Sequence, residues 1–149
     1  MNGQTTTPDV RKTLVVDDDL VILKTLSIAL NANGYQVLTA PDGPGAVRIV
    51  TREKPDLIIL DIQFPVDAAN VGGALQDGFF IIEWLHRMGE GKDIPIIIIS
   101  ADQSTKARQR ALAAGAVAFF SKPIDRVALL DTIRATLGEG AKGPRPVTA

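Results

Sequence analysis

The sequence predicts an α/β domain in which helices cover both faces of one parallel sheet. Five short runs of branched apolar residues are spaced along the chain, and continuous runs of this kind are typical of parallel strands buried on both faces. The longer segments between them repeat their apolar residues at helical spacing. This alternation indicates a doubly wound sheet, because parallel strands need crossover connections that pack on its faces.

The expected strands are short and lie at residues 13–16, 36–38, 57–60, 96–99 and 117–120. The third and fourth are entirely apolar, and the fourth is a run of isoleucines. A membrane-spanning helix needs about 20 apolar residues, so none of these runs predicts a bilayer span. Five such β-α units favour a flavodoxin-like sheet with the strand order 2-1-3-4-5.

The expected helices are marked by apolar residues at helical spacing and by residues that favour helix ends. Asp19 suits an N-cap before the first helix, and Gly34 suits a left-handed C-cap after it. Gly115 closes the fourth helix. The apolar markers of the five helices, in chain order, are Leu23, Leu26 and Leu30; Ala46, Ile49 and Val50; Ile81, Trp84, Leu85 and Met88; Ala107 and Ala111; and Val127, Leu130 and Leu137.

Length and composition indicate one domain, which we assign to residues 11–137. A chain of 149 residues supports one core, and 46% hydrophobic with 22% charged residues is a globular composition. Residues 1–10 and 138–149 are polar or rich in glycine and proline, and we expect both segments to be flexible.

Composition also excludes several kinds of chemistry and partner. The chain has no cysteine, which removes disulfides, thiolate nucleophiles and zinc–cysteine sites. Its formal charge of −1 gives no reason to expect direct binding to nucleic acid. The sequence contains no signal-peptide pattern either. We therefore expect a cytoplasmic protein without nucleic-acid or membrane partners.

Polar residues follow four of the five expected strands. Asp17 and Asp18 follow the first strand, Asp61 the third and Ser100 the fourth, and Lys122 comes shortly after the fifth. In an open parallel sheet, ligands collect at the carboxyl ends of the strands, next to the point where the strand order reverses. We expect these five side chains to converge there.

Three carboxylates that converge repel one another, so the site needs a compensating charge. At ~4 Å and an effective dielectric of about 20, each pair of like charges costs on the order of 4 kcal/mol. A protonated carboxyl, the Lys122 ammonium or a divalent cation would offset this, and we favour lysine with Mg²⁺, which prefers oxygen ligands. A carboxylate beside both cations suits phosphoryl transfer, with an acyl phosphate as the product.

Four segments at these strand ends make the chain resemble a response-regulator receiver domain over about residues 11–137. They are Leu-Val-Val-Asp-Asp-Asp at 14–19, Asp-Leu-Ile-Ile-Leu-Asp-Ile-Gln-Phe-Pro at 56–65, the segment 96–101 and Lys122-Pro123. The resemblance implies a Mg²⁺-dependent phosphoacceptor that is not an enzyme acting on separate substrates. It also implies that the phosphoryl donor is a sensor histidine kinase or a histidine phosphotransfer protein, and that a downstream protein target receives the signal.

The resemblance implies a role for each site residue. Asp61 is the phosphoacceptor, and Asp17, Asp18, Asp61 and the backbone carbonyl of Gln63 hold Mg²⁺. Lys122 pairs with the phosphoryl group.

Signalling in the resembled family involves a hydroxyl and an aromatic side chain. Ser100 matches the switch hydroxyl, and Phe119 matches the switch aromatic that turns inward when the hydroxyl moves. The output surface is formed by the fourth helix, the fifth strand and the fifth helix. The bond between Lys122 and Pro123 is cis in the family.

The chain departs from the family pattern after the third strand. Phe64 stands where receivers often carry methionine, and residues 66–76 form an insertion in the connection to the third helix. Loops of this length tend to be functional. We interpret residues 68–75 as a lid or a partner-contact element.

Two other functions fit parts of the sequence. Residues 17–21 match the Asp-x-Asp-x-Val signature of haloacid-dehalogenase-like phosphatases, with Asp17 as the nucleophile. That reading leaves Asp61 unexplained. A degenerate receiver that only binds partners is the other alternative, and failure to accept phosphate would favour it.

Overall fold

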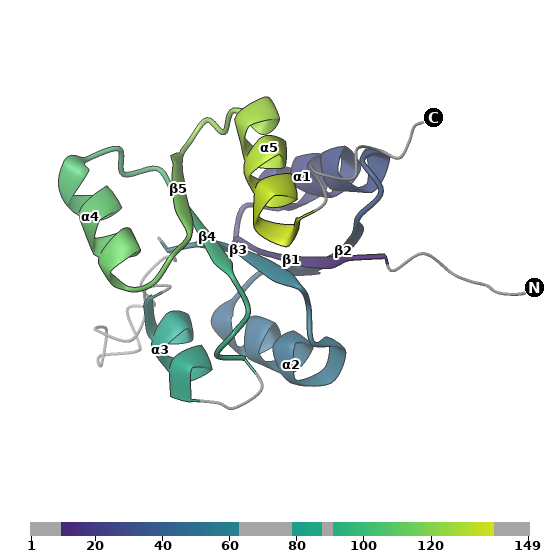
Figure 1. Cartoon of the computed structure of the whole chain (residues 1–149), viewed down its shortest axis with the longest axis horizontal. Coiled ribbons are helices and arrows are strands. Elements are labelled where there is room, and N and C mark those ends of the chain that lie inside the picture. Colours follow the sequence, from purple (N-terminus) through teal and green to yellow (C-terminus); the bar gives the residue numbers. More distant parts are fainter. Residues whose placement is uncertain (1–9, 63–78, 88–90, 139–149) are drawn as a thin grey trace, which may run out of the picture.

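The computed structural model describes residues 10–62, 79–87 and 91–138, and these residues form the predicted sheet (Figure 1). All neighbouring strands are parallel, in the order β2-β1-β3-β4-β5. The strands are β1 (Lys12–Val16), β2 (Gln36–Ala40), β3 (Leu57–Asp61), β4 (Ile96–Ser100) and β5 (Ala118–Ser121). The flavodoxin-like fold and its strand order are therefore confirmed.

Helices cover both faces of the sheet, as Figure 1 shows. They are α1 (Leu20–Ala32), α2 (Gly43–Glu53), α3 (Phe79–Arg87), α4 (Thr105–Ala113) and α5 (Arg126–Leu137). The helices α1 and α5 share one apolar cluster with the sheet, and α2, α3 and α4 share the other. The molecule thus has three layers, with a core on each side of the sheet.

Alternate residues of each central strand supply the two cores. In β1, Leu14 and Val16 enter the cluster with α2, α3 and α4, whereas Val15 enters the cluster with α1 and α5. The side chains of β3 and β4 divide in the same way, because successive residues of a strand point to opposite faces. Continuous apolar runs are what such a doubly covered sheet requires.

Side chains cap the helices that begin at the carboxyl edge of the sheet. Asp19 accepts a hydrogen bond from the Val21 amide at 2.9 Å, so the predicted N-cap of α1 is confirmed. Gly34 and Gly115 both have positive φ, +91° and +106°, each two residues beyond the end of its helix. These glycines adopt the left-handed conformation that the sequence predicts.

One predicted boundary needs correction. The fifth strand is Ala118–Ser121 rather than 117–120, because Val117 lies outside it and is exposed. Trp84 packs against the core and is half-buried, beside the buried residues Ile81 and Leu85. Gln63, Phe64, the insertion at 66–76, Met88 and most of both terminal segments lie outside the described residues.

No helix in the described ranges is long and apolar enough to cross a membrane.

Candidate functional site

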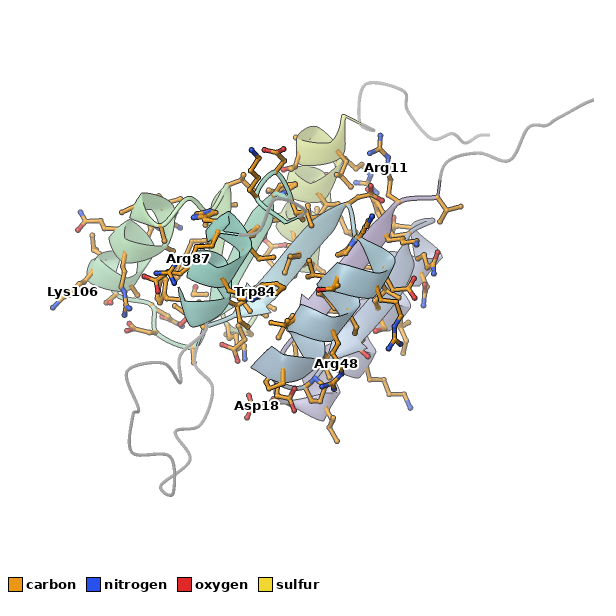
Figure 2. The ribbon with its side chains drawn as sticks, turned by 90° about the horizontal axis from the view of Figure 1, so that it is seen from below. Arg11, Asp18, Arg48, Trp84, Arg87 and Lys106 are labelled. Carbon is orange, nitrogen blue, oxygen red and sulfur yellow. The ribbon has the colours of Figure 1, made fainter. Side chains whose placement is uncertain are left out.

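Three aspartates meet at the carboxyl edge of the sheet. Val16 of β1 pairs with Leu60 of β3, so Asp17 and Asp61 follow neighbouring strands at the same level. One carboxylate oxygen from each of Asp17, Asp18 and Asp61 lies within 4.8 Å of the others. Asp18 lies at the rim of the molecule, where Figure 2 labels it.

The aspartates differ in burial. Asp17 is 0% exposed and Asp61 is 2% exposed, whereas Asp18 is open to solvent. The Asp17 amide donates to the Ala40 carbonyl at 3.1 Å, which ties the end of β1 to β2. Its Oδ1 accepts the Asp19 amide at 2.8 Å. Burial of two carboxylates in this way costs several kcal/mol per ion unless the charges are compensated.

Lys122 supplies part of the compensation from the segment after β5. Its Nζ lies 2.9 Å from Oδ2 of Asp17 and 3.1 Å from Oδ2 of Asp61. The contact with Asp61 has hydrogen-bond geometry, whereas the closer contact with Asp17 is poorly directed and counts as an ion pair alone. The Lys122–Pro123 peptide bond is cis, as the resemblance implies.

The carboxylates raise the pKa of Lys122. Partial burial of the ammonium acts in the opposite direction and lowers this pKa, but the contacts with Asp17 and Asp61 outweigh it. The Lys122 side chain is therefore charged over the whole physiological range.

The donor set of the cluster fits a hard divalent cation. One ammonium against three carboxylates leaves the cluster negative overall. Oδ2 of Asp17 is buried and has no hydrogen-bond partner among the residues that the structure describes. Carboxylate oxygens are the ligands that Mg²⁺ takes, usually alongside water, and exposed Asp18 leaves solvent access on one side.

Ser100 ends β4 next to this cluster and is fully buried. Its hydroxyl accepts a hydrogen bond from the Asp102 amide at 3.0 Å. Its carbonyl accepts the Lys122 amide at 2.8 Å, which joins the ends of β4 and β5. The Asp102 amide thus holds the predicted switch hydroxyl, and the Ser100 carbonyl ties this residue to the backbone of Lys122.

The loop between β4 and α4 adds contacts that the sequence reading missed. Gln103 donates from Nε2 to the Lys122 carbonyl at 3.0 Å. Asp102 accepts the Ser104 amide at 2.9 Å, and hydrogen bonding from the Ser104 backbone and side chain lowers the pKa of Asp102. No sequence pattern signals a bond between residues 103 and 122, because each is an ordinary loop residue.

Phe119, the predicted switch aromatic, is 5% exposed and lies in the core with α4. The Arg108 guanidinium stands over its ring at 5.5 Å from the centroid. No sequence pattern predicts this placement of the Arg108 cation over an aromatic ring.

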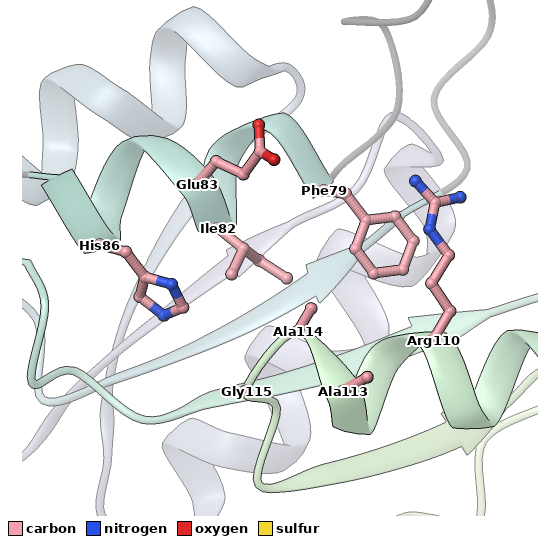
Figure 3. A pocket seen from close by; sticks show the side chains of 8 residues that line it. All are labelled: Phe79, Ile82, Glu83, His86, Arg110, Ala113, Ala114 and Gly115. Carbon is pink, nitrogen blue, oxygen red and sulfur yellow. The ribbon is translucent and has the colours of Figure 1, made fainter.

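A separate cavity of about 510 Å³ lies between α3 and α4 (Figure 3). Its lining includes Phe79, Glu83, His86 and Arg110, and none of the aspartates, Ser100 or Lys122. The Arg110 guanidinium lies 3.8 Å from the centre of the Phe79 ring. His86 is exposed.

Fold and site together define a receiver-type signalling domain. A doubly wound sheet of this strand order carries an acidic cluster, a lysine and a hydroxyl at its carboxyl edge. The chain belongs to the response regulator receiver domain family, whose model matches residues 13–134. The resemblance inferred from the sequence is thereby confirmed.

Curated relatives are longer than this chain. The transcriptional regulatory protein PrrA of Mycobacterium tuberculosis is 36% identical over 126 residues, which are 85% of this chain and 49% of that protein. The response regulator PleD of Caulobacter vibrioides is 35% identical over 122 residues, 82% of this chain and 25% of PleD. The chain therefore spans about half the length of these relatives, or less.

Solved structures match over nearly their full length. The chemotaxis protein CheY4 of Vibrio cholerae is 29% identical with a TM-score of 0.74, covering 86% of this chain and 99% of that one. The receiver domain of the sensor histidine kinase PA1611 from Pseudomonas aeruginosa is 27% identical with a TM-score of 0.73, covering 87% and 99%. That structure holds a magnesium ion in its active-site cleft.

Proposed function

We propose that this chain is a phosphoacceptor receiver of a two-component system and that Asp61 is its acceptor. A sensor histidine kinase or a histidine phosphotransfer protein supplies the phosphoryl group. The observation that carries the proposal is the buried Asp61 carboxylate, which contacts Lys122 at 3.1 Å within a cluster of three aspartates. A residue that only fills the core would be apolar, and a surface ion pair would not bring three carboxylates together around one lysine.

The chemistry is a displacement at phosphorus. An oxygen of Asp61 attacks the phosphoryl group, a new P–O bond forms, and the bond to the donor's histidine nitrogen breaks. The imidazole leaves with its electron pair and becomes neutral or protonated according to the pH. Lys122, 20% exposed and already paired with Asp61, offsets negative charge on the transferring oxygens.

Mg²⁺ is the proposed cofactor. Asp17, Asp18 and Asp61 would hold it, together with the backbone carbonyl of Gln63, a residue outside the described ranges. When bound, Mg²⁺ acts as a Lewis acid that neutralises phosphoryl charge. The three carboxylate oxygens that lie within 4.8 Å of one another and the magnesium ion in the active-site cleft of the PA1611 receiver support this assignment.

Movement of side chains near the acceptor is proposed to pass the signal to the surface of the domain. Ser100 is the proposed switch hydroxyl and Phe119 the switch aromatic, and α4, β5 and α5 form the surface that a downstream protein reads. We assign the receiver domain to residues 11–137, and most of the two terminal segments, 1–10 and 138–149, lies outside the described residues. The protein signals rather than turning over a separate substrate, and it contacts neither nucleic acid nor membrane directly.

Intact mass after incubation with acetyl phosphate tests the proposal. In this reaction the P–O bond to acetate breaks as the bond to Asp61 forms. The native chain should gain one phosphoryl group when Mg²⁺ is present, and Asp61→Asn should gain none. Asp131→Asn is the matched control, since Asp131 is an exposed aspartate on α5.

The same measurement separates the alternatives. A phosphoryl group retained by Asp61→Asn would point to Asp17 and the phosphatase reading. No gain by the native chain would indicate a receiver that only binds partners.

A further inference from the structure

Ser100 on β4 and Phe119 on β5 are joined by a chain of contacts through the start of α4. The Ser100 hydroxyl accepts the Asp102 amide at 3.0 Å, and the Asp102 carboxylate accepts the Ser104 amide at 2.9 Å. Ser104 caps α4, and its carbonyl accepts the Arg108 amide at 3.2 Å. The Arg108 guanidinium then lies over the Phe119 ring. A displacement of the hydroxyl therefore has a continuous route to the aromatic side chain.

Phe119 lies in the core cluster that α4 covers. The residues of α4 and its C-cap that pack against this core are alanines: Ala107, Ala111 and Ala114. Such small side chains make room for an aromatic ring beneath the helix, but each offers little surface to hold it. Arg108 is exposed, so its cation covers the ring from the solvent side.

We propose that Arg108 is a positioning residue whose cation holds Phe119 in its buried position and thereby favours the conformation in which Asp61 accepts a phosphoryl group. This inference deepens the proposed function and rests on it. A side chain shifts an equilibrium only by its differential interaction with the two states. The contact of Arg108 with the buried ring favours the buried state by the part of this interaction that is lost when the ring turns outward.

The expected effect is modest and measurable. A cation–π contact at an exposed position changes an equilibrium by about two- to fivefold. The initial rate at which the full chain is phosphorylated by acetyl phosphate with Mg²⁺ should fall by about that factor in Arg108→Gln. Arg108→Lys keeps a cation near the ring and should recover part of the rate.

Lys106→Gln is the matched control for charge. Lys106 is a basic residue of the same helix, and Figure 2 shows it projecting away from the molecule. Its substitution removes the same charge without touching the ring and should leave the rate unchanged. An equal loss in Lys106→Gln would mean that α4 acts through its net charge, and the proposal would be overturned.

A double-mutant cycle separates positioning from general damage. Phe119→Leu removes the aromatic ring, so Arg108→Gln should have no further effect in that background. If Arg108→Gln slows phosphorylation by the same factor with and without the ring, Arg108 does not act through Phe119 and the inference is wrong. Loss of stability alone does not mimic the expected coupling, because it would affect both backgrounds.

The outcome also distinguishes this inference from the proposed function. A native chain that gains no phosphoryl group contradicts the function, and the inference falls with it. A native chain that is phosphorylated but shows no coupling between Arg108 and Phe119 contradicts the inference alone.

Discussion

The interiors of the strands bury apolar side chains, whereas their carboxyl ends bury charged ones. Leu57, Ile58, Ile59 and Leu60 of β3 are all fully buried among apolar neighbours. The next residue, Asp61, is almost as buried, yet it lies among two other carboxylates. The apolar part of the strand lowers the free energy of the fold, whereas its carboxyl end raises it by bringing like charges together. The proposed acceptor thus lies where the stable apolar framework ends.

The largest effect is expected in the strand interior. Ile59→Ala removes a fully buried side chain from the core beneath α1 and α5. We expect the free energy of unfolding to fall by about 2–5 kcal/mol, because lost transfer energy and a residual cavity add together. Urea unfolding followed by circular dichroism measures this. A loss below about 1 kcal/mol would mean that the interior is not tightly packed.

Metal binding should reverse the cost of the carboxyl ends. At a hundredfold excess over its dissociation constant, Mg²⁺ should raise the free energy of unfolding of the native chain by about 2.7 kcal/mol. Asp17→Asn loses a buried ligand and should respond far less. Urea unfolding with and without Mg²⁺ gives both values, and a buffer free of divalent cations is the common reference. Equal gains in the two chains would exclude Asp17 as a ligand.

Without metal, neutralising a site carboxylate should stabilise the fold. Asp61→Asn removes one of the mutually repelling charges and leaves Lys122 paired with Asp17. We expect a gain of about 1 kcal/mol in urea unfolding without divalent cations. Ile59→Ala, two residues earlier in the same strand, is expected to have the opposite effect on stability. A clear loss of stability would show that Asp61 contributes more through Lys122 than it costs.

The smallest expected effect concerns alkaline pH. The pKa of Lys122 lies above its ordinary value of 10.5, so protonation of this ammonium favours the folded state. Its contribution is fully present below the ordinary value and is lost as the pH rises through the raised value of the folded state. Above pH 10.5 the free energy of unfolding of the native chain should therefore fall relative to that of Lys122→Gln. A difference independent of pH would contradict this.

Local patterns in the sequence were sufficient to predict the fold and the convergence of Asp17, Asp61 and Lys122 at one edge of the sheet. Apolar runs define buried strands, helical spacing defines the helices between them, and Asp19 caps α1 as expected. Since parallel strands bring their carboxyl ends to one edge, residues far apart in the chain were predicted to converge there. The boundary of β5 was less well predicted, because it depends on neighbouring packing.

The tertiary structure alone decided how the site is connected. Lys122 contacts both Asp17 and Asp61, Gln103 donates a hydrogen bond to the Lys122 carbonyl, and the Arg108 cation lies over the Phe119 ring. Each contact joins residues whose types are common on any surface, and each exists only at a particular distance and orientation between separate elements. Periodicity and strand-end position determine which residues reach the edge of the sheet, but hydrogen bonds and cation–π contacts depend on ångström-scale geometry that no one-dimensional pattern contains.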